Sequence, residues 1–280
     1  MSNKINFDFL KEPDSDTELL KKVRECNTNK ESTLSSFNYA INLIIESFLQ
    51  HLFCPQKLDL VKDILNNSIN TNVDIIYKYS ESPIEKIFLN SLLTHFLAPI
   101  ANNYFDATLS FLPLFTHPMT NTNKQLEELT EAYEESVEIC NRGDINETID
   151  NLNDLFNKQV IDSELLKSFE EFLYQHQINN FRYKTYHFTM QSVFPDLKVD
   201  GKPIRTDLLI WKPNDKKFKL IVECDGFQFH SGKKSFTNDR KRDRLLQTKG
   251  FDVFRFSGLE IYHEPFKASL ELFNYLKSKE

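Results

Sequence analysis

Three acidic residues stand at the ends of two apolar runs in the C-terminal third of the chain. Asp207 comes directly before the run Leu208–Trp211, whereas Glu223 and Asp225 come directly after the run Phe218–Val222. Residues two apart on a strand share a face, so Glu223 and Asp225 are expected to point the same way. If a neighbouring strand brings Asp207 beside them, the carboxylates repel one another unless protons or a cation lie among them. Carboxylate oxygens, water and phosphate are the ligands that Mg²⁺ prefers, and the pattern therefore indicates metal-dependent phosphodiester chemistry.

The two apolar runs are predicted to be strands that pair as a hairpin. The segment Lys212–Lys217 separates them and contains Pro213 and Asn214, which is typical of a turn. Alternation over 184–193 predicts an earlier strand, which a hairpin-type turn at 199–202 joins to the first acidic strand.

The composition changes near residue 181. Of the 6 glycines, only Gly143 lies before that point, and the others lie between residues 201 and 258, as does the single Trp. The earlier part has long stretches of helical periodicity, which predicts a helical part followed by a mixed α/β part. In the later part, a basic helix over 235–249, a buried strand over 251–256 and a closing helix over 265–277 are expected.

Helices are predicted for most of the chain before residue 181. The N-terminal region 1–80 contains helical patterns over 32–53 and 58–65, while the periodicity over 73–79 fits either a strand or a continued helix. Ser82 and Pro83 predict the start of a helix that reaches Leu93 or beyond, in which Glu85 takes the position of a capping-box glutamate. Residues 124–176 indicate two or three acidic amphipathic helices, whose leucines and phenylalanines are most simply explained as core.

The charge distribution gives two opposing indications about nucleic acid. The net charge of −7 argues weakly against such a partner, but residues 231–250 contain only two acidic residues and a cluster of basic ones. A basic patch beside an acidic metal site is suited to a phosphate backbone, whereas taken alone it could equally be a solvated helix face. The basic residues are Lys233, Lys234, Arg240, Lys241, Arg242, Arg244 and Lys249.

Cysteine spacing and hydropathy indicate a cytoplasmic protein. The 4 cysteines are scattered, with no paired spacing, which favours reduced thiols over a zinc site or a disulfide framework. No apolar run has the length of a signal-peptide core or of a membrane span, so no membrane association is expected.

The ordered set of these motifs resembles the restriction-endonuclease-like, or PD-(D/E)XK, nucleases, in particular the branch of the very-short-patch-repair endonucleases. The matching pieces cover somewhat over a third of the chain. They are Ser82–Glu85 on the first helix, Gln191 on the first strand, Asp207 on the second, Glu223–His230 on and after the third, and Arg242–Phe256. The resemblance implies an α/β (α+β) fold in which a helix and flanking helices surround a mixed central sheet. That core would comprise residues 81–99 and 181–280, and a helical insertion at 100–180 would interrupt it.

The resemblance also implies roles for individual residues. Asp207 and Glu223 would bind Mg²⁺, or Mn²⁺ in its place, with the backbone carbonyl of Cys224 as a further ligand. Glu85 corresponds to the acidic residue that the first helix often lends to such sites. Two departures are notable, because Thr206 replaces a proline and Asp225 replaces the lysine of the Glu-x-Lys element.

His230 matches a histidine of the very-short-patch-repair branch by spacing. It is therefore a candidate to activate water or to protonate the leaving oxygen, while Asp225 could bind the metal or orient His230. The sequence does not decide which residue replaces the lysine. It also does not decide whether the protein has lost nuclease activity altogether. Because Glu85 takes the position of a capping-box glutamate, its role could also be purely structural.

The expected function is that of a Mg²⁺-dependent DNA endonuclease, by analogy in defence against foreign DNA or in repair. A set of basic side chains would position the DNA backbone: Lys233, Lys234, Arg240, Lys241 and Arg242. Two alternatives are an RNA-directed nuclease and a degenerate nuclease fold that binds nucleic acid or a partner without cutting. The helical regions are candidates for a homodimer contact or for binding a partner protein, and the acidic insertion is a poor direct phosphate binder.

Overall fold

The structure of the protein is a computed structural model, which describes residues 24–25, 27–49, 55–102, 112–142, 144–158, 162–226 and 233–279. The described strands form one sheet with the order β1-β2-β3-β4-β5. Their bounds are β1 Leu114–Thr116, β2 His187–Val199, β3 Lys202–Lys212, β4 Asp215–Asp225 and β5 Asp252–Ser257. The outer pairs, β1 with β2 and β4 with β5, are parallel, and the central pairs are antiparallel. The predicted mixed sheet with flanking helices is confirmed.

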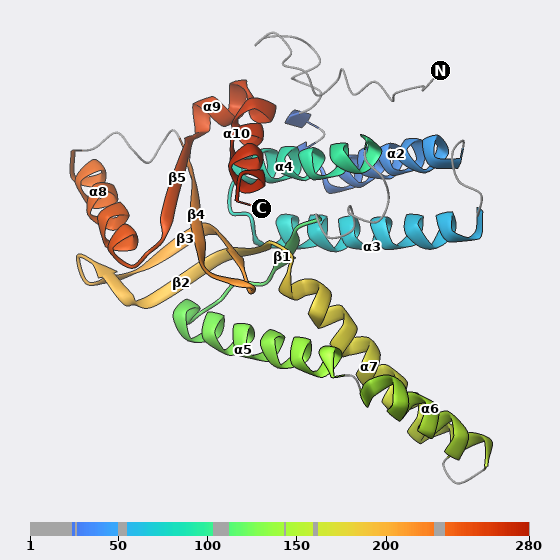
Figure 1. Cartoon of the computed structure of the whole chain (residues 1–280). Coiled ribbons are helices and arrows are strands. Elements are labelled where there is room, and N and C mark those ends of the chain that lie inside the picture. Colours follow the sequence, from blue (N-terminus) through green and yellow to red (C-terminus); the bar gives the residue numbers. More distant parts are fainter. Residues whose placement is uncertain are drawn as a thin grey trace.

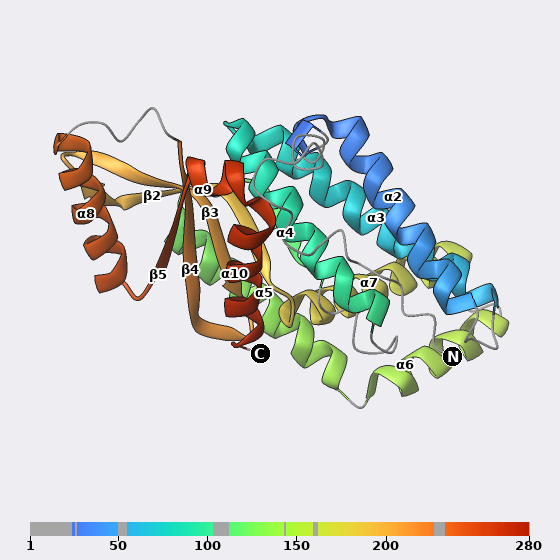
Figure 2. The same cartoon turned by 90° about the horizontal axis from the view of Figure 1, so that it is seen from above.

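Helices from the N-terminal region and from the end of the chain cover one face of the sheet (Figures 1 and 2). The alternate apolar residues of the central strands, such as Leu208, Ile210 and Val222, pack in the larger core against these helices. The helices are α2 Lys30–Leu49, α3 Pro55–Tyr79, α4 Pro83–Asn102, the short α9 Gly258–His263 and α10 Pro265–Lys277.

The opposite face of the sheet packs against α5 (Thr122–Asn141) and α8 (Lys233–Thr248). Leu126 of α5 and Leu246 of α8 contribute to this second core, together with Trp211 and Ile221 of the central strands. The central strands are therefore apolar on both faces, so that few positions on them can carry a charge without a partner.

Two further helices extend from the body of the molecule. These are α6 (Asp144–Asn157) and α7 (Ser163–Tyr183), and Figure 1 shows α6 and the adjoining end of α7 lying away from the sheet. None of the residues of α7 is buried. None of the helices in the described ranges has the length and apolar character of a membrane span.

Most of the predicted elements are found, with changes in length. The segment 73–79, which the periodicity left undecided, is the end of the single long helix α3, and this helix also includes the pattern at 58–65. The predicted strand at 184–193 is β2, which continues to Val199. The strand β1 was not predicted, because three residues are too few to show an alternating pattern.

Both predicted turns are confirmed. The β2–β3 hairpin turns at Asp200 and Gly201, which have φ values of 49° and 78°, as a two-residue turn of the primed type requires. The β3–β4 hairpin turns between Lys212 and Asp215, which are partners in the register.

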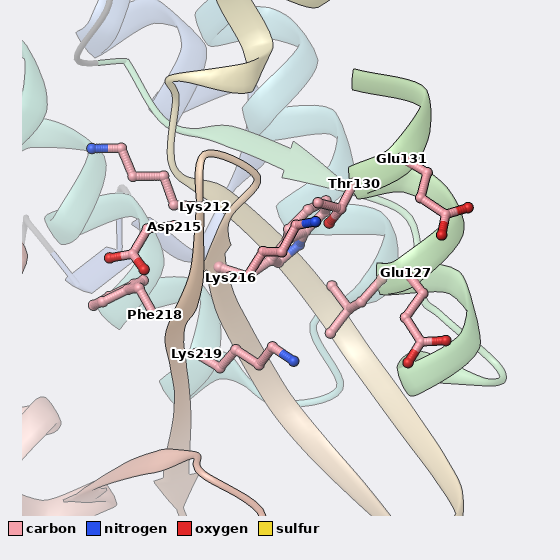
Figure 3. A pocket seen from close by; sticks show the side chains of 10 residues that line it. Glu127, Thr130, Glu131, Lys212, Asp215, Lys216, Phe218 and Lys219 are labelled. Atoms are coloured by element: carbon pink, nitrogen blue, oxygen red, sulfur yellow. The ribbon is translucent and has the colours of Figure 1, made fainter. Parts of the chain in front are cut away.

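A hollow of about 250 Å³ lies between α5 and the β3–β4 hairpin (Figure 3). Its lysines are engaged by neighbours. Lys216 forms an ion pair with Glu134 of α5, and Lys219 lies 5.9 Å from the centre of the Phe251 ring. The ion pair between Lys216 and Glu134 joins the hairpin to α5 beside this hollow, and we interpret the hollow as part of the packing of α5 against the sheet.

His187 at the start of β2 connects the helices α5 and α7 to the sheet. The residue is 1% exposed, and the centre of its ring lies 4.5 Å from that of Trp211 and 5.3 Å from that of Tyr133. Its Nε2 is 2.9 Å from the carbonyl oxygen of Arg182, to which it donates a hydrogen bond. Burial lowers the pKa of His187 from 6.5 to about 4.

This buried histidine is expected to make the protein less stable as the pH falls. Below pH 6.5 the unfolded chain protonates His187 but the folded protein does not until about pH 4, so stability is lost across that window. The loss from this one group is at most about 3 kcal/mol. Urea unfolding of the wild type and of His187→Gln at pH 4.5, 5.5 and 7 should show a smaller pH dependence for the variant. Equal pH dependence in the two proteins would contradict this interpretation.

Candidate active site

Asp207 and Glu223 face each other across the β3–β4 pair. They lie one step beyond the paired residues Leu208 and Val222, at the end of the hairpin away from its turn. The Oδ2 of Asp207 accepts a hydrogen bond of 2.8 Å from the backbone N–H of Cys224, which joins the carboxylate to the neighbouring strand. Burial raises the pKa of Asp207, with a smaller opposing effect from that hydrogen bond.

Glu223 is the most deeply buried carboxyl group of the site, with only 4% of its surface exposed. Burial raises its pKa to about 8, even though the nearby Arg242 acts in the opposite direction. The Nη2 of Arg242, from α8, donates hydrogen bonds both to Glu223 Oε1 and to the carbonyl oxygen of Arg205. A guanidinium group therefore provides the positive charge beside Glu223 in this structure.

Glu85 lies on the first turn of α4 and comes close to Asp207. It is 5% exposed, and its carboxylate accepts hydrogen bonds from the Ser82 hydroxyl at 2.8 Å and from the Glu81 backbone N–H at 3.1 Å. The Ser82 hydroxyl in turn accepts from the Glu85 N–H at 3.2 Å. Burial raises the pKa of Glu85, and the charge of Asp207 raises it further. The capping role and the place beside Asp207 are thus combined in one residue.

Asp225 points to the same face as Glu223 but is held by a different partner. Arg255 of β5 binds it through two hydrogen bonds of 2.8 and 2.7 Å, and also forms ion pairs with Asp243 and Asp239 of α8. The register pairs Arg255 with Glu223, which places the guanidinium beside both strand-end carboxylates. Asp225 is therefore part of an ion-pair network that ties β4, β5 and α8 together.

The predicted basic residues of α8 lie in different surroundings. Arg240, Lys241 and Arg244 are exposed, and Lys241 is 3.4 Å from Asp200 of the β2–β3 turn. Arg242 instead turns inward to Glu223. His230 and the side chains of Lys233 and Lys234 lie outside the described residues.

Arg255 was not singled out in the sequence, although a signal was present. It stands in the middle of a predicted buried strand, where a charged side chain needs an opposite charge nearby. A parallel pairing of that strand with the one that ends in Asp225 would have suggested the contact.

The donor groups of the site are suited to a hard divalent cation. Asp207 lies near both Glu85 and Glu223, and burial raises the pKa of all three carboxyl groups, so that protons, the Arg242 guanidinium or a bound cation must compensate their charge. Within the described ranges, however, no three His, Cys, Asp or Glu side chains are arranged to enclose a metal ion. One oxygen of Glu223 is taken by Arg242, which would have to release it for that oxygen to bind a cation.

Comparison with known families matches this part of the chain. Residues 187–276, which contain Asp207, Glu223, Asp225 and α8, match the sequence model of REase_MTES_1575, a restriction-endonuclease-like family. This segment is restriction-endonuclease-like. No curated protein and no solved structure matches the chain.

The predicted resemblance to restriction-endonuclease-like nucleases is thereby confirmed, whereas the very-short-patch-repair branch stays a prediction. Glu85 lies outside the matched nuclease-like segment, and its place in the site follows from the packing of α4 against the sheet.

Proposed function

We propose that the protein is a metal-dependent endonuclease that hydrolyses phosphodiester bonds of DNA. The observation that carries the proposal is the position of the half-buried Asp207 near two buried glutamates, Glu85 and Glu223, all three with raised pKa values. Such a costly arrangement of buried acids is typical of functional sites.

Asp207, Glu223 and the backbone carbonyl of Cys224 would hold Mg²⁺ or Mn²⁺, and Glu85 would add a carboxylate from the helix side. A bound divalent cation supplies Lewis-acid polarisation of the phosphodiester and makes water a stronger nucleophile. In the reaction, a water oxygen forms a new bond to phosphorus, the bond to the leaving sugar oxygen breaks, and that oxygen takes up a proton.

Arg242 is the residue that we assign to the phosphate. Its Nε is buried and has no hydrogen-bond partner within the described residues, so the guanidinium is only partly satisfied by Glu223 and the Arg205 carbonyl. An incoming phosphate can accept from such a group, and Arg240 and Arg244 on the same helix are exposed for further contacts with the backbone. This arrangement favours Arg242 over the other basic residues as the cation that takes the place of the missing lysine.

Cleavage by the purified protein tests the proposal. Supercoiled plasmid, single-stranded DNA and RNA should be incubated with the wild type and Asp207→Asn in EDTA, Mg²⁺ or Mn²⁺. We expect cleavage of DNA that needs the cation and falls by roughly a thousandfold in the variant. Asp196→Asn, an exposed aspartate of β2, is the matched control and should cut like the wild type. Preferential cleavage of RNA would replace the proposed substrate.

A second candidate function is binding of nucleic acid without cleavage. Asp225 stands where the related nucleases carry a lysine, and Arg255 holds it in a structural ion pair. Salt-dependent binding of DNA without cleavage in any of the three conditions, undiminished in Asp207→Asn, would favour this function.

A further inference from the structure

Gln191 has an unusual backbone for a residue within a strand. Its φ is 47°, and Asp200, in the β2–β3 turn, is the only other non-glycine residue with positive φ in the described ranges. Met190 pairs with Leu208, and Ser192 pairs with Thr206. Gln191 and Asp207 therefore lie opposite each other between these two pairs, but they are not themselves paired. A left-handed residue in a strand is strained and persists only where its surroundings hold it, often at a functional site.

The side chain of Gln191 is held on one side only. It is 7% exposed, and its Nε2 donates a hydrogen bond of 3.1 Å to Glu85 Oε2. Its Oε1 is buried and has no hydrogen-bond partner within the described part of the chain. The opposite amide orientation would direct Oε1 at the Glu85 carboxylate instead, so the orientation with Oε1 free is the favourable one for an ionised Glu85. A buried acceptor without a partner is destabilising and needs an explanation.

We infer that Gln191 is a cation-binding residue and that its Oε1, together with Glu85 and Asp207, provides oxygens for a divalent cation. The inference rests on the proposed function, and it adds a residue that the acidic motif does not contain. An amide oxygen is a suitable ligand for a hard cation, and it adds a donor without adding negative charge to a place that already contains two carboxylates. The strained backbone is explained as well, because it turns the side chain of Gln191 toward Glu85 at the position opposite Asp207.

Binding of Mn²⁺ to the full chain, measured by electron paramagnetic resonance and by titration calorimetry, tests the inference. Gln191→Gly removes the amide but accepts the positive φ readily. We therefore expect its Kd for Mn²⁺ to rise about tenfold or more, while its Tm in EDTA stays equal to that of the wild type or higher. Asp200→Gly is the matched control, since it relieves the same backbone strain away from the site, and its Kd should stay within about twofold of the wild type.

The outcomes separate this inference from the proposed function. Wild-type Mn²⁺ affinity in Gln191→Gly would overturn the role of Gln191 and leave the nuclease proposal intact. If the wild type itself binds no Mn²⁺, both are overturned. Should Gln191→Gly fail to fold, Gln191→Met decides, because it keeps the length of the side chain without the amide oxygen. Its Kd should rise equally, and an unchanged Kd would again exclude the inference.

Discussion

Glu223→Gln is expected to abolish cleavage and, in the absence of divalent cations, to make the protein more resistant to unfolding. The two effects share one cause. The carboxylate that we propose as a cation ligand is buried, and the folded protein disfavours its charged form strongly enough to raise the pKa to about 8. A neutral glutamine of the same shape no longer imposes that unfavourable burial, and its amide oxygen can still accept from Arg242.

The sign of the stability effect follows from proton linkage. The unfolded chain ionises Glu223 above its ordinary pKa of 4.5, whereas the folded protein keeps the proton until about pH 8. The wild type therefore loses stability between these two pH values, and the variant does not lose this contribution. At pH 8 we expect Glu223→Gln to be more stable by roughly 2 kcal/mol or more, and near pH 4.5 by little.

Urea unfolding in EDTA at pH 5 and pH 8, together with plasmid cleavage in Mg²⁺, measures both effects in the same preparations. Cleavage should fall by about a thousandfold or more. Glu271→Gln, an exposed residue of α10, serves as the control for loss of a carboxylate and should change neither quantity. A variant that loses activity and also stability at pH 8 would indicate that Glu223 is chiefly a structural partner of Arg242.

The position of the acidic pair could be predicted from the sequence because the constraint is local. Apolar runs on both sides of a short turn predict a hairpin, and the acids at the outer ends of the runs then lie at the same end of it. The exact register that places Asp207 beside Glu223 also includes a shift between Trp211 and Lys212, which the sequence does not show. Glu85 could not be placed in this way. Its contact with the site depends on the packing of α4 against the sheet, and only the resemblance to known nucleases indicated it.

The charged partners of these acids were harder to predict, because they come from other elements. The structure has Arg255 on Asp225 and Arg242 on Glu223, and neither contact was predicted. Both contacts depend on how β5 and α8 lie against β4, a matter of tertiary packing that spacing along the chain does not encode. The turned backbone of Gln191 is likewise invisible in the sequence, since glutamine has no preference for positive φ.

The role of Arg242 leads to an unusual expectation for Arg242→Met, which should bind Mn²⁺ more tightly than the wild type and yet cleave DNA more slowly. In the present structure the guanidinium occupies one oxygen of Glu223, and it therefore competes with a cation for the same carboxylate. Removal of the guanidinium ends that competition. It would also remove the charged hydrogen-bond donor that we propose for the substrate phosphate, for which a loss of about a hundredfold in cleavage rate is expected.

Arg244→Met is the matched control, since Arg244 lies on the same helix two residues away and is exposed. It should weaken DNA binding modestly at low salt and leave Mn²⁺ binding unchanged. Titration calorimetry with Mn²⁺ and single-turnover cleavage distinguish the two effects of Arg242→Met. Weaker Mn²⁺ binding in Arg242→Met would mean that the guanidinium holds Glu223 in place for the cation, and an unchanged cleavage rate would remove Arg242 from the reaction. If the guanidinium of Arg242 binds Glu223 in the free protein and the phosphate in the complex with DNA, its removal should give both tighter Mn²⁺ binding and slower cleavage.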